Sequence, residues 1–380
     1  MDFSHTEEHE SFRKMLRKFF EKEAPTERVH ELDRTETFPT ETYAKMAELG
    51  LCGITIPEEY GGNPMDEITK CIVAEEMSRA AGHLCYAFMP TVGFCAKGIN
   101  VFGTEEQKQF YLPSIADGSI RFAMALTEPN SGSDLSSLRT SAKPTDDGWA
   151  VSGQKVFSTG ADSAQYLMVM VRTDQESPGH RGLSVMMVPR DAEGVSVRPL
   201  RKMAGQAVHT CEIFFDDVHV GRDALLGEAG RGANIIFSLL DAERILVGAQ
   251  SLGIAQGALD VAAQYATDRK QFGGPIIDFQ AVGHQLTDMA MDVEAARLVV
   301  HKAAWRMEQG LPVRREAAMA KIVGSETGTR CALRGMQVMG GYSYMAEYPM
   351  ERWFREAKLY EIVGGSNQIL RNVLVDQLRP

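Results

Sequence analysis

The centre of the chain contains two short β-prone runs, YLMVMV at Tyr166–Val171 and LSVMMV at Leu183–Val188. Similar runs follow at Val195–Val197 and Glu212–Val220. Short runs that are rich in valine and separated by turn residues are typical of β-strands. They predict a compact β segment between about residues 119 and 227.

Helical spacing flanks this β segment on both sides. Before it, apolar residues recur three and four positions apart, as at Phe12, Met15, Leu16 and Phe19. After it, the spacing predicts long helices at about 231–268, 279–309 and 313–340. An α–β–α order with one β insert indicates an α+β fold rather than a doubly wound parallel sheet. We therefore expect an N-terminal α-helical domain at 1–118, a middle β domain at 119–227 and a C-terminal α-helical domain at 228–380.

Composition and charge exclude several classes of protein. The 380 residues are 44% hydrophobic and 24% charged, the profile of a globular protein with a sizeable core. A net charge of −11 without a basic block argues against nucleic-acid or membrane partners. The apolar run Tyr166–Val171 is far shorter than the ~20 residues of a membrane span. The acidic N-terminus lacks the order of a secretory signal, so we expect a cytoplasmic protein.

The sequence contains no convincing metal-binding or nucleotide-binding motif. The six cysteines form no Cys-x-x-Cys pair, which favours reduced core thiols over a metal or disulfide framework. His5 and His9 lack a convincing third ligand, so we predict no metal site. Gly227-x-x-Gly230-x-Gly232 has neither the spacing nor the preceding strand of a dinucleotide fingerprint, and no phosphate-binding loop of the G-x-x-x-x-G-K-[ST] type exists.

One glutamate interrupts an apolar stripe in the predicted helix at 231–268. Five positions share one helix face: Ile236, Leu239, Leu240, Glu243 and Val247. A carboxylate that faces a core loses hydration, so its pKa rises unless a partner compensates. Arg244 is adjacent but lies about 100° round the helix, so it is not automatically that partner. Glu243 is thus either a structural glutamate, paired or reaching the rim, or a general base in an apolar pocket.

Several motifs, in order, carry a resemblance to a known family. They are Leu126-Thr127-Glu128-Pro129-Asn130-Ser131-Gly132-Ser133-Asp134, Asp268-Arg269-Lys270-Gln271-Phe272-Gly273, Phe279-Gln280, Gln337-Val338-Met339-Gly340-Gly341-Tyr342 and Gly364-Gly365-Ser366-Asn367-Gln368-Ile369. Together they resemble the flavin-dependent acyl-CoA dehydrogenase family, and the likeness extends from Asp2-Phe3 to the last helix. The resemblance implies an N-terminal helical domain, a middle β domain and a C-terminal four-helix domain, assembled as a homotetramer that is a dimer of dimers.

The resemblance also implies an FAD site between the β and C-terminal domains, completed by a neighbouring subunit. Seven residues would line the flavin ring: Met124, Leu126, Thr127, Ser133, Phe157, Ser158 and Thr159. Arg269 and Phe272 would serve the diphosphate and adenosine end across a subunit interface. The remaining residues implied near the cofactor are Gln280, Gln337, Gly341, Ser366 and Gln368. Arginine and closely approached glycine suit a flavin diphosphate.

The implied reaction is α,β-dehydrogenation of an acyl-CoA thioester. A carboxylate removes the α-proton while the β-hydride passes to flavin N5, which gives a trans-2-enoyl-CoA. A backbone N–H and the ribityl 2′-hydroxyl polarise the thioester oxygen. The resemblance implies an electron-transfer flavoprotein as electron acceptor.

The chain departs from the usual family pattern at the catalytic position. Most members place the catalytic glutamate immediately before Gly-Thr or Gly-Ser in the last motif, where this chain has Gly364; Glu361 is three residues too early. A minority, resembling isovaleryl-CoA and long-chain acyl-CoA dehydrogenases, carry the base on a C-terminal-domain helix immediately before an arginine. Glu243-Arg244 fits that position, so the resemblance implies that Glu243 is the catalytic base.

Substrate contacts follow from the same likeness. Asp241 and Arg244 would flank the thioester and pantetheine, Ser133 would lie near the CoA entry, and Gly364 would offer its N–H to the thioester oxygen. The stretch Leu84–Phe94, expected at the acyl pocket, has no lysine or arginine, which favours a neutral short, branched or alicyclic acyl group.

Three alternatives stay open from the sequence. The same site can run as an enoyl-CoA reductase, because the flavin couple is reversible. It can also act on an acyl group tethered to a carrier protein. A non-enzymatic, flavin-binding homologue that has lost catalysis is the third alternative.

Overall fold

A computed structural model describes residues 6–177 and 179–378 of the chain. Asp2, Phe3 and His5 lie outside the described residues. The chain divides into two units: a helical unit (Met1–Thr35, Asp66–Cys85 and Asp241–Pro380) and a sheet unit (Glu36–Met65 and Tyr86–Leu240). The expected α+β class is confirmed by the helices and the sheet described below.

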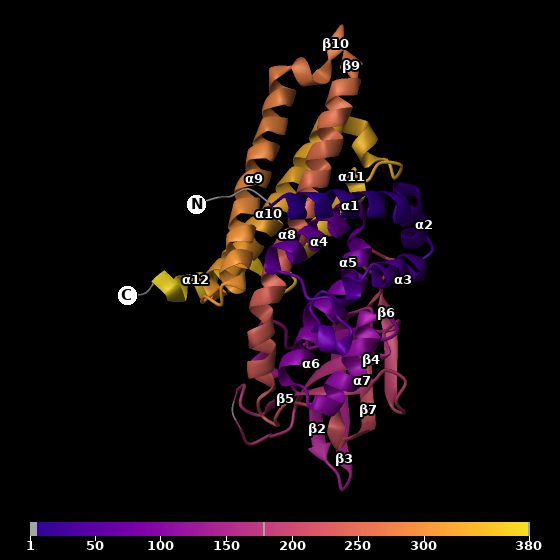
Figure 1. Cartoon of the computed structure of the whole chain (residues 1–380), viewed down its shortest axis with the longest axis vertical. Helices are drawn as coiled ribbons and strands as arrows, with labels where there is room; N and C mark the ends of the chain where they lie inside the picture. The colour runs from indigo at the N-terminus through magenta and orange to yellow at the C-terminus, as the bar shows by residue number, and fades with distance from the viewer. Residues whose placement is uncertain (1–5, 178, 379–380) are drawn as a thin grey trace. The chain divides into compact units, whose positions relative to one another are not determined.

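The helical unit contains the long helices that the apolar spacing predicts. Its helices are α1 (Glu7–Glu23), α2 (Thr26–Arg34), α4 (Glu67–Ala80), most of α8 (Gly232–Asp268), α9 (Gln280–Glu308), α10 (Arg314–Met339), α11 (Met350–Tyr360) and α12 (Asn367–Leu378). The predicted stretches at 231–268, 279–309 and 313–340 agree with α8, α9 and α10 to within a residue or two, and Figure 1 shows α9 and α10 side by side. A two-stranded hairpin, β9 (Lys270–Gln271) and β10 (Gly274–Pro275), joins α8 to α9.

Two glycines let the backbones of α8 and α10 approach closely. A Cβ atom on Gly324 would lie 2.7 Å from the carbonyl oxygen of Gly248, and a Cβ on Gly248 would lie 2.7 Å from that of Ala320. Neither position therefore admits a side chain unless the helices move apart. This contact fixes the register of α8 against α10, one turn from Lys321 and about one turn from Glu243.

The sheet unit is built around an eight-stranded sheet with the order β6-β7-β3-β2-β4-β5-β8, in which β1 pairs in parallel with β4. The strands are β1 (Phe122–Ala125), β2 (Ser141–Pro144), β3 (Gly148–Thr159), β4 (Tyr166–Arg172), β5 (Leu183–Pro189), β6 (Val195–Leu200), β7 (Thr210–Gly221) and β8 (Leu225–Leu226). All the predicted β-prone runs are strands. Buried residues of these strands, mostly alanines and valines, form a hydrophobic core in this unit.

Short helices complete the sheet unit. They are α3 (Thr40–Glu48), η1 (Leu51–Gly53), η2 (Glu58–Tyr60), the π-helix η3 (Met89–Cys95), α6 (Ala96–Phe102), α7 (Glu105–Ala116), η4 (Leu135–Ser137) and η5 (Arg222–Ala224). Helix α5 (Gly82–Phe88) leads into η3, and the division between the units falls within it. The expected acyl-pocket stretch Leu84–Phe94 is therefore helical, with a π-helical second half, a distortion that is frequent at functional sites.

Two further expectations concern the cysteines and helices that could span a membrane. All six cysteines are buried and free, as predicted. Among the described residues one helix, α8, is long and apolar enough to cross a membrane, with a mean hydropathy of 1.3 over its best window. Because 78% of that window is buried inside the protein, α8 has the character of a core helix.

Candidate functional site

Helix α8 carries Glu243 on the apolar stripe that the sequence predicts. Ile236, Leu239 and Val247, which share its face, are buried. Glu243 is partly buried, and its Oε2 atom is shielded from solvent without a hydrogen-bond partner among the described residues. A shielded carboxylate oxygen with no donor is unusual in a folded protein and is a candidate for chemistry.

The positively charged side chains near Glu243 form no ion pair with its carboxylate within the described residues. Burial raises the pKa of Glu243 to about 7, although the charges of Arg244 and Lys321 act in the opposite direction. Arg244 donates instead to Asp241 Oδ1 at 3.0 Å and to the carbonyl oxygen of Gly364 at 3.4 Å. The described part of the chain gives Glu243 no ion pair, so the structural ion-pair interpretation has no support. A carboxylate with this pKa is suited to general-base catalysis near neutral pH.

The loop between α11 and α12 brings Gly364 in front of Glu243. Gly364 has φ +68° and Gly365 has φ +92°, conformations that favour glycine. A Cβ atom on Gly364 would lie 4.0 Å from both Cδ and Oε1 of Glu243. The N–H of Gly364 has no acceptor in the described part of the chain. Ser366 caps α12, because its Oγ accepts from Ile369 N at 3.3 Å, and Gln368 is exposed on the first turn.

Glu361, in the same loop, is engaged elsewhere. Its Oε1 accepts from the Thr329 hydroxyl at 2.6 Å and its Oε2 from Lys358 Nζ at 2.7 Å. Partial burial acts to raise the pKa of Glu361, but these hydrogen bonds outweigh it and hold the pKa below its ordinary value. Glu361 therefore does not compete with Glu243 as a base.

In the sheet unit, the ends of β1 and β3 bring together the residues expected at the flavin ring. Thr127 O accepts from Val156 N at 2.9 Å, and Lys155 Nζ donates to Leu126 O at 3.0 Å. The other residues of the set lie on the same strands or on the turn that follows β1: Met124, Ser133, Phe157, Ser158 and Thr159. All seven residues expected at the ring thus belong to the sheet unit, on β1, on β3 or on the segment that follows β1.

A β-bulge shapes this edge of the sheet. Between the pairs Lys155–Ile213 and Ser158–Cys211, β3 has one residue more than β7. Phe157 lies in the bulge with φ +61° and is 66% exposed, whereas the Ser158 hydroxyl is buried without a hydrogen-bond partner among the described residues. Bulges commonly redirect a side chain beside an active site.

A buried ion pair that the sequence does not predict lies at the same edge of the sheet. Lys155 is fully buried and donates to Glu128 Oε1 at 3.0 Å. Glu128 also accepts from the backbone N–H groups of Arg139 and Thr140, at 2.8 and 2.7 Å. Glu128 belongs to a quoted motif, but no local pattern indicates that Lys155 would point inward to meet it.

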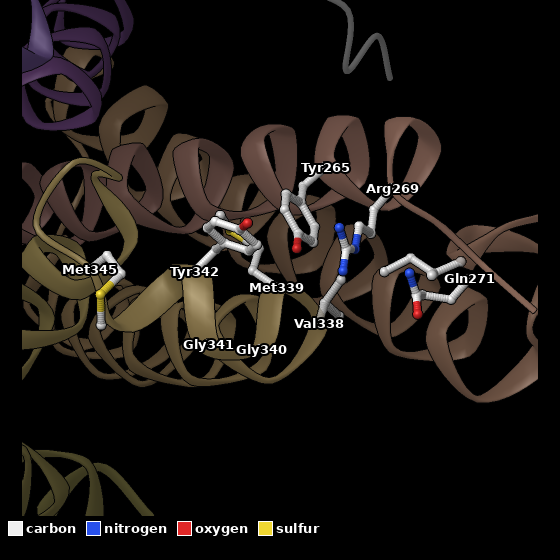
Figure 2. Close-up of a pocket in the computed structure, with 10 residues that line it drawn as sticks. Tyr265, Arg269, Gln271, Val338, Met339, Gly340, Gly341, Tyr342 and Met345 are labelled. Carbon is white, nitrogen blue, oxygen red and sulfur yellow. The ribbon is translucent and has the colours of Figure 1, made fainter.

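A third group of predicted residues lies at the far end of α8. A cavity of about 410 Å³ is lined there by Tyr265, Arg269, Gln271, Ile276, Val338, Met339, Gly340, Gly341, Tyr342 and Met345. Figure 2 shows Tyr265 and Arg269 facing the Gly340–Tyr342 turn. The Arg269 guanidinium lies 6.0 Å from the centroid of the Tyr342 ring, and a Cβ on Gly341 would meet nothing within 4 Å.

The lining of this cavity does not include Phe272, Gln280 or Gln337. Phe272 is 97% exposed on the β9–β10 hairpin, and Gln280 and Gln337 are exposed on α9 and α10. Arg269 is 26 residues along α8 from Glu243, or about 39 Å at 1.5 Å per residue. Within the helical unit of one chain the structure therefore does not bring the Arg269 group to Glu243, and a role of Arg269 at a neighbouring subunit stays a prediction.

The residues present fit FAD. The cavity offers a guanidinium, tyrosine rings and open glycine backbone, which suit an anionic diphosphate and flat aromatic rings. The buried Ser158 hydroxyl on β3 has no hydrogen-bond partner among the described residues, and it belongs to the set expected to face the flavin ring. Within the described residues there is no cluster of His, Cys, Asp or Glu that could hold a metal ion.

Comparison with known proteins identifies the family. The family models for the acyl-CoA dehydrogenase N-terminal, middle and C-terminal domains match residues 6–119, 123–218 and 230–378. The chain is 40% identical over 379 residues to a probable acyl-CoA dehydrogenase, YngJ, of Bacillus subtilis, with all of both chains covered. It is 37% identical to the caffeyl-CoA reductase-Etf complex subunit CarC of Acetobacterium woodii, with 98% of each chain covered.

Solved structures agree with these matches. The structure of butyryl-CoA dehydrogenase from Megasphaera elsdenii is similar with a TM-score of 0.94 and 36% identity, and all of both chains is covered. The expected order of helical, β and helical domains is thereby confirmed, while the boundaries 1–118, 119–227 and 228–380 stay predictions. The chain belongs to the acyl-CoA dehydrogenase family of FAD-dependent oxidoreductases.

Proposed function

We propose that the protein removes hydrogen from the α and β carbons of an acyl-CoA, with Glu243 as the base that takes the α-proton. The observation that carries this proposal is the Oε2 atom of Glu243, which is shielded, unpartnered and directed at no donor of the described chain. With a pKa of about 7, the carboxylate is ionised in a useful fraction at neutral pH and basic enough to accept a proton.

Gly364 supplies the complementary group. Its unpaired N–H and the Glu243 carboxylate are close neighbours, so a thioester bound between them can present its oxygen to the one and its α-carbon to the other. A hydrogen bond to the thioester oxygen acidifies the α-carbon because negative charge develops on that oxygen as the proton leaves. Asp241 and Arg244 hold each other at the edge of this space, and we propose that they contact the thioester and pantetheine.

FAD, when bound, supplies the redox chemistry by accepting the hydride from the β-carbon. The contribution of the protein is to bind and orient the groups, to exclude water and to receive the proton. We propose that Met124, Leu126, Thr127, Ser133, Phe157, Ser158 and Thr159 hold the ring, and that Ser366 and Gln368 lie near it. Arg269, Phe272, Gln280, Gln337 and Gly341 would hold the adenosine and diphosphate end of the cofactor of a neighbouring subunit.

The acyl group that we propose is neutral and short, branched or alicyclic. Its support is the absence of lysine and arginine from the helical stretch Leu84–Phe94, since a dicarboxylyl chain requires a cation at its end. We further propose a homotetramer, an electron-transfer flavoprotein as partner and a cytoplasmic location. The separation of about 39 Å between Arg269 and Glu243 along α8 supports the oligomer, and the Etf-associated relative supports the partner.

Anaerobic titration of the purified yellow protein with saturated and unsaturated acyl-CoAs tests the proposal. A saturated thioester is expected to bleach the flavin absorbance, and Glu243→Gln is expected to retain FAD but to lose at least about 10³-fold in the rate of bleaching. Glu361→Gln is the matched control, because Glu361 is already paired with Thr329 and Lys358, and it keeps the wild-type rate. Normal turnover by Glu243→Gln would contradict the assignment of the base.

A second candidate function is enoyl-CoA reduction. Its support is the relative CarC of the caffeyl-CoA reductase-Etf complex, at 37% identity. The same residues serve both directions, because the group that removes the α-proton returns it in the reverse reaction. Reoxidation of the reduced protein by an enoyl-CoA, with no bleaching by any saturated partner, favours the reductase. Absence of any response to a broad panel favours a carrier-bound substrate or a homologue without catalysis.

A further inference from the structure

A lysine outside the quoted motifs is buried beneath the glycine loop. Lys321 of α10 is fully buried, and its Nζ donates to the carbonyl oxygen of Gly365 and to Asn367 Oδ1, both at 2.9 Å. An ammonium group has three donors, and two of them are directed at the segment that carries Gly364. Burial lowers the pKa of Lys321 to about 8, although Glu361 and Glu243 act to raise it.

Asn367 extends this contact into a small buried network. Its Nδ2 donates to Ser325 Oγ at 3.1 Å and to Glu326 Oε1 at 3.2 Å. Lys321 and Ser325 are four residues apart, so they lie on the same face of α10 and hold Asn367 from two successive turns. The first residue of α12 is thereby tied to α10.

The loop is held from two helices at consecutive carbonyls. Arg244 on α8 donates to Gly364 O at 3.4 Å, and Lys321 on α10 donates to Gly365 O. The close contact of Gly248 with Gly324 fixes the two helices against each other. The peptide groups on both sides of Gly365 are thereby held, one from each helix, and the loop is anchored immediately after Gly364.

Stability alone does not account for a lysine at this position. Burying a charged group is costly, and replacement of a buried ionic group by a hydrophobic side chain of similar volume is often neutral or stabilising. Lys321 also faces Glu243 and Arg244 on α8, Glu326 on its own helix and Glu361 in the loop. A cation in this place favours the ionised form of Glu243, which is the form that accepts a proton.

We propose that Lys321 is a positioning residue for the dehydrogenation: its buried ammonium group holds the Gly364–Gly365 loop on α10, so that Gly364 stays beside the carboxylate of Glu243. This inference rests on the proposed function of Glu243 and Gly364. It assigns to Lys321 no contact with substrate or cofactor.

The test compares Lys321→Met with the surface control Lys302→Met, both as full-length protein with FAD bound. Lys302 is exposed on α9, so its replacement is expected to change nothing. Turnover is measured with the acyl-CoA that bleaches the wild-type protein fastest. Proton removal is measured separately, as exchange of the α-protons with solvent deuterium in an acyl-CoA in which sulfur replaces the β-carbon, because this probe has no β-hydrogen to transfer.

For Lys321→Met we expect wild-type FAD content, kcat and α-exchange lowered about 100-fold, and a KM within about 3-fold of wild type. The acidic limb of the pH profile of kcat/KM is expected to move up by about 0.5–1 pH unit, because the ionised form of Glu243 has lost a nearby cation. A lysine with a purely structural role would not move this limb.

If Lys321→Met does not retain FAD, Lys321→Gln decides, since its amide keeps a donor and removes the charge. Wild-type kcat, α-exchange and pH profile in the variant that folds would overturn the role of Lys321 while leaving the proposed function intact. If the wild-type protein itself neither turns over nor exchanges α-protons with any acyl-CoA of the panel, the proposed function fails, and the role of Lys321 falls with it.

Discussion

The carboxyl carbon of Glu243 lies 4.0 Å from the point that a Cβ atom on Gly364 would occupy. The two positions belong to different elements, the middle of α8 and the loop before α12, yet a side chain at position 364 would enter the space beside the Glu243 carboxylate. The nearest atom to the Gly364 Cβ position is Val247 Cγ2, at 3.9 Å, which is an ordinary van der Waals distance. A carboxylate attached at position 243 or at position 364 can therefore reach this space.

Moving the carboxylate across this space tests the geometry. Glu243→Ala is expected to lose at least about 10³-fold in kcat. Adding Gly364→Glu to that variant is expected to recover about 10-fold or more, and to stay below wild type because φ +68° strains a non-glycine residue. Single-turnover bleaching of the flavin is the measurement. Gly364→Gln in the same background is the control, and recovery there would show that a carboxylate is not what matters.

The pH dependence of turnover follows from the raised pKa of Glu243. Because the proposed base, Glu243, must be ionised, kcat/KM is expected to rise about tenfold per pH unit up to about pH 7 and to level off above it. The profile is measured with a slow substrate so that proton removal limits the rate. A profile that is flat between pH 5 and 8 would contradict the pKa that burial gives to Glu243.

The same pKa makes a prediction about stability. Burial raises the pKa of Glu243 from an ordinary 4.5 to about 7, so the folded state binds more protons than the unfolded state between these values. Wild type is therefore expected to lose stability as pH rises through this window, by at most about 3 kcal/mol. Glu243→Gln has no such proton and should melt at a higher temperature than wild type at pH 8, with the difference shrinking towards pH 4.5. A difference in Tm that stays constant with pH would refute the linkage.

The contact between α8 and α10 can be tested by adding one methyl group. In Gly324→Ala the new Cβ would meet the Gly248 carbonyl oxygen at 2.7 Å, and a backbone atom cannot move aside alone. We expect a loss of about 1–3 kcal/mol and a lower kcat, because the helices that hold Glu243 and Lys321 must separate.

Gly335→Ala, on the same helix, is the matched control. Its Cβ would meet the end of the buried Met350 side chain, and a side-chain end can shift where a backbone carbonyl cannot, so the loss of stability should be smaller than in Gly324→Ala. Thermal unfolding of both variants decides the matter. Equal Tm values would mean that the α8–α10 contact does not constrain the site.

Periodicity predicted the elements that hold the site because burial leaves a regular mark in the sequence. The apolar stripe of Ile236, Leu239 and Val247 required helix α8, and the one carboxylate on that stripe required an explanation. Arg244, although adjacent in sequence, is not the partner of Glu243, because its guanidinium pairs with Asp241. These inferences depend only on neighbours within one helix.

Contacts between residues that are far apart in the sequence produce no periodic pattern by which they could be predicted. Lys321 and Asn367 are 46 positions apart and meet only after α10 and α12 have packed. Lys155 meets Glu128 across two strands in the same way. The positive φ of Phe157 arises from a bulge, which depends on the partner strand and not on the residue itself. Composition and spacing carry no information of this kind.

The mid-helix location of Glu243 has a consequence for how the family can diversify. A base in the middle of a long helix keeps its position when the loop before α12 changes. A base on that loop would shift with each insertion or replacement there. With Glu243 as the proposed base, the Gly364–Gly365 segment of this chain does not carry the reactive group. Changes in that segment can therefore alter the space beside Gly364 without removing the carboxylate.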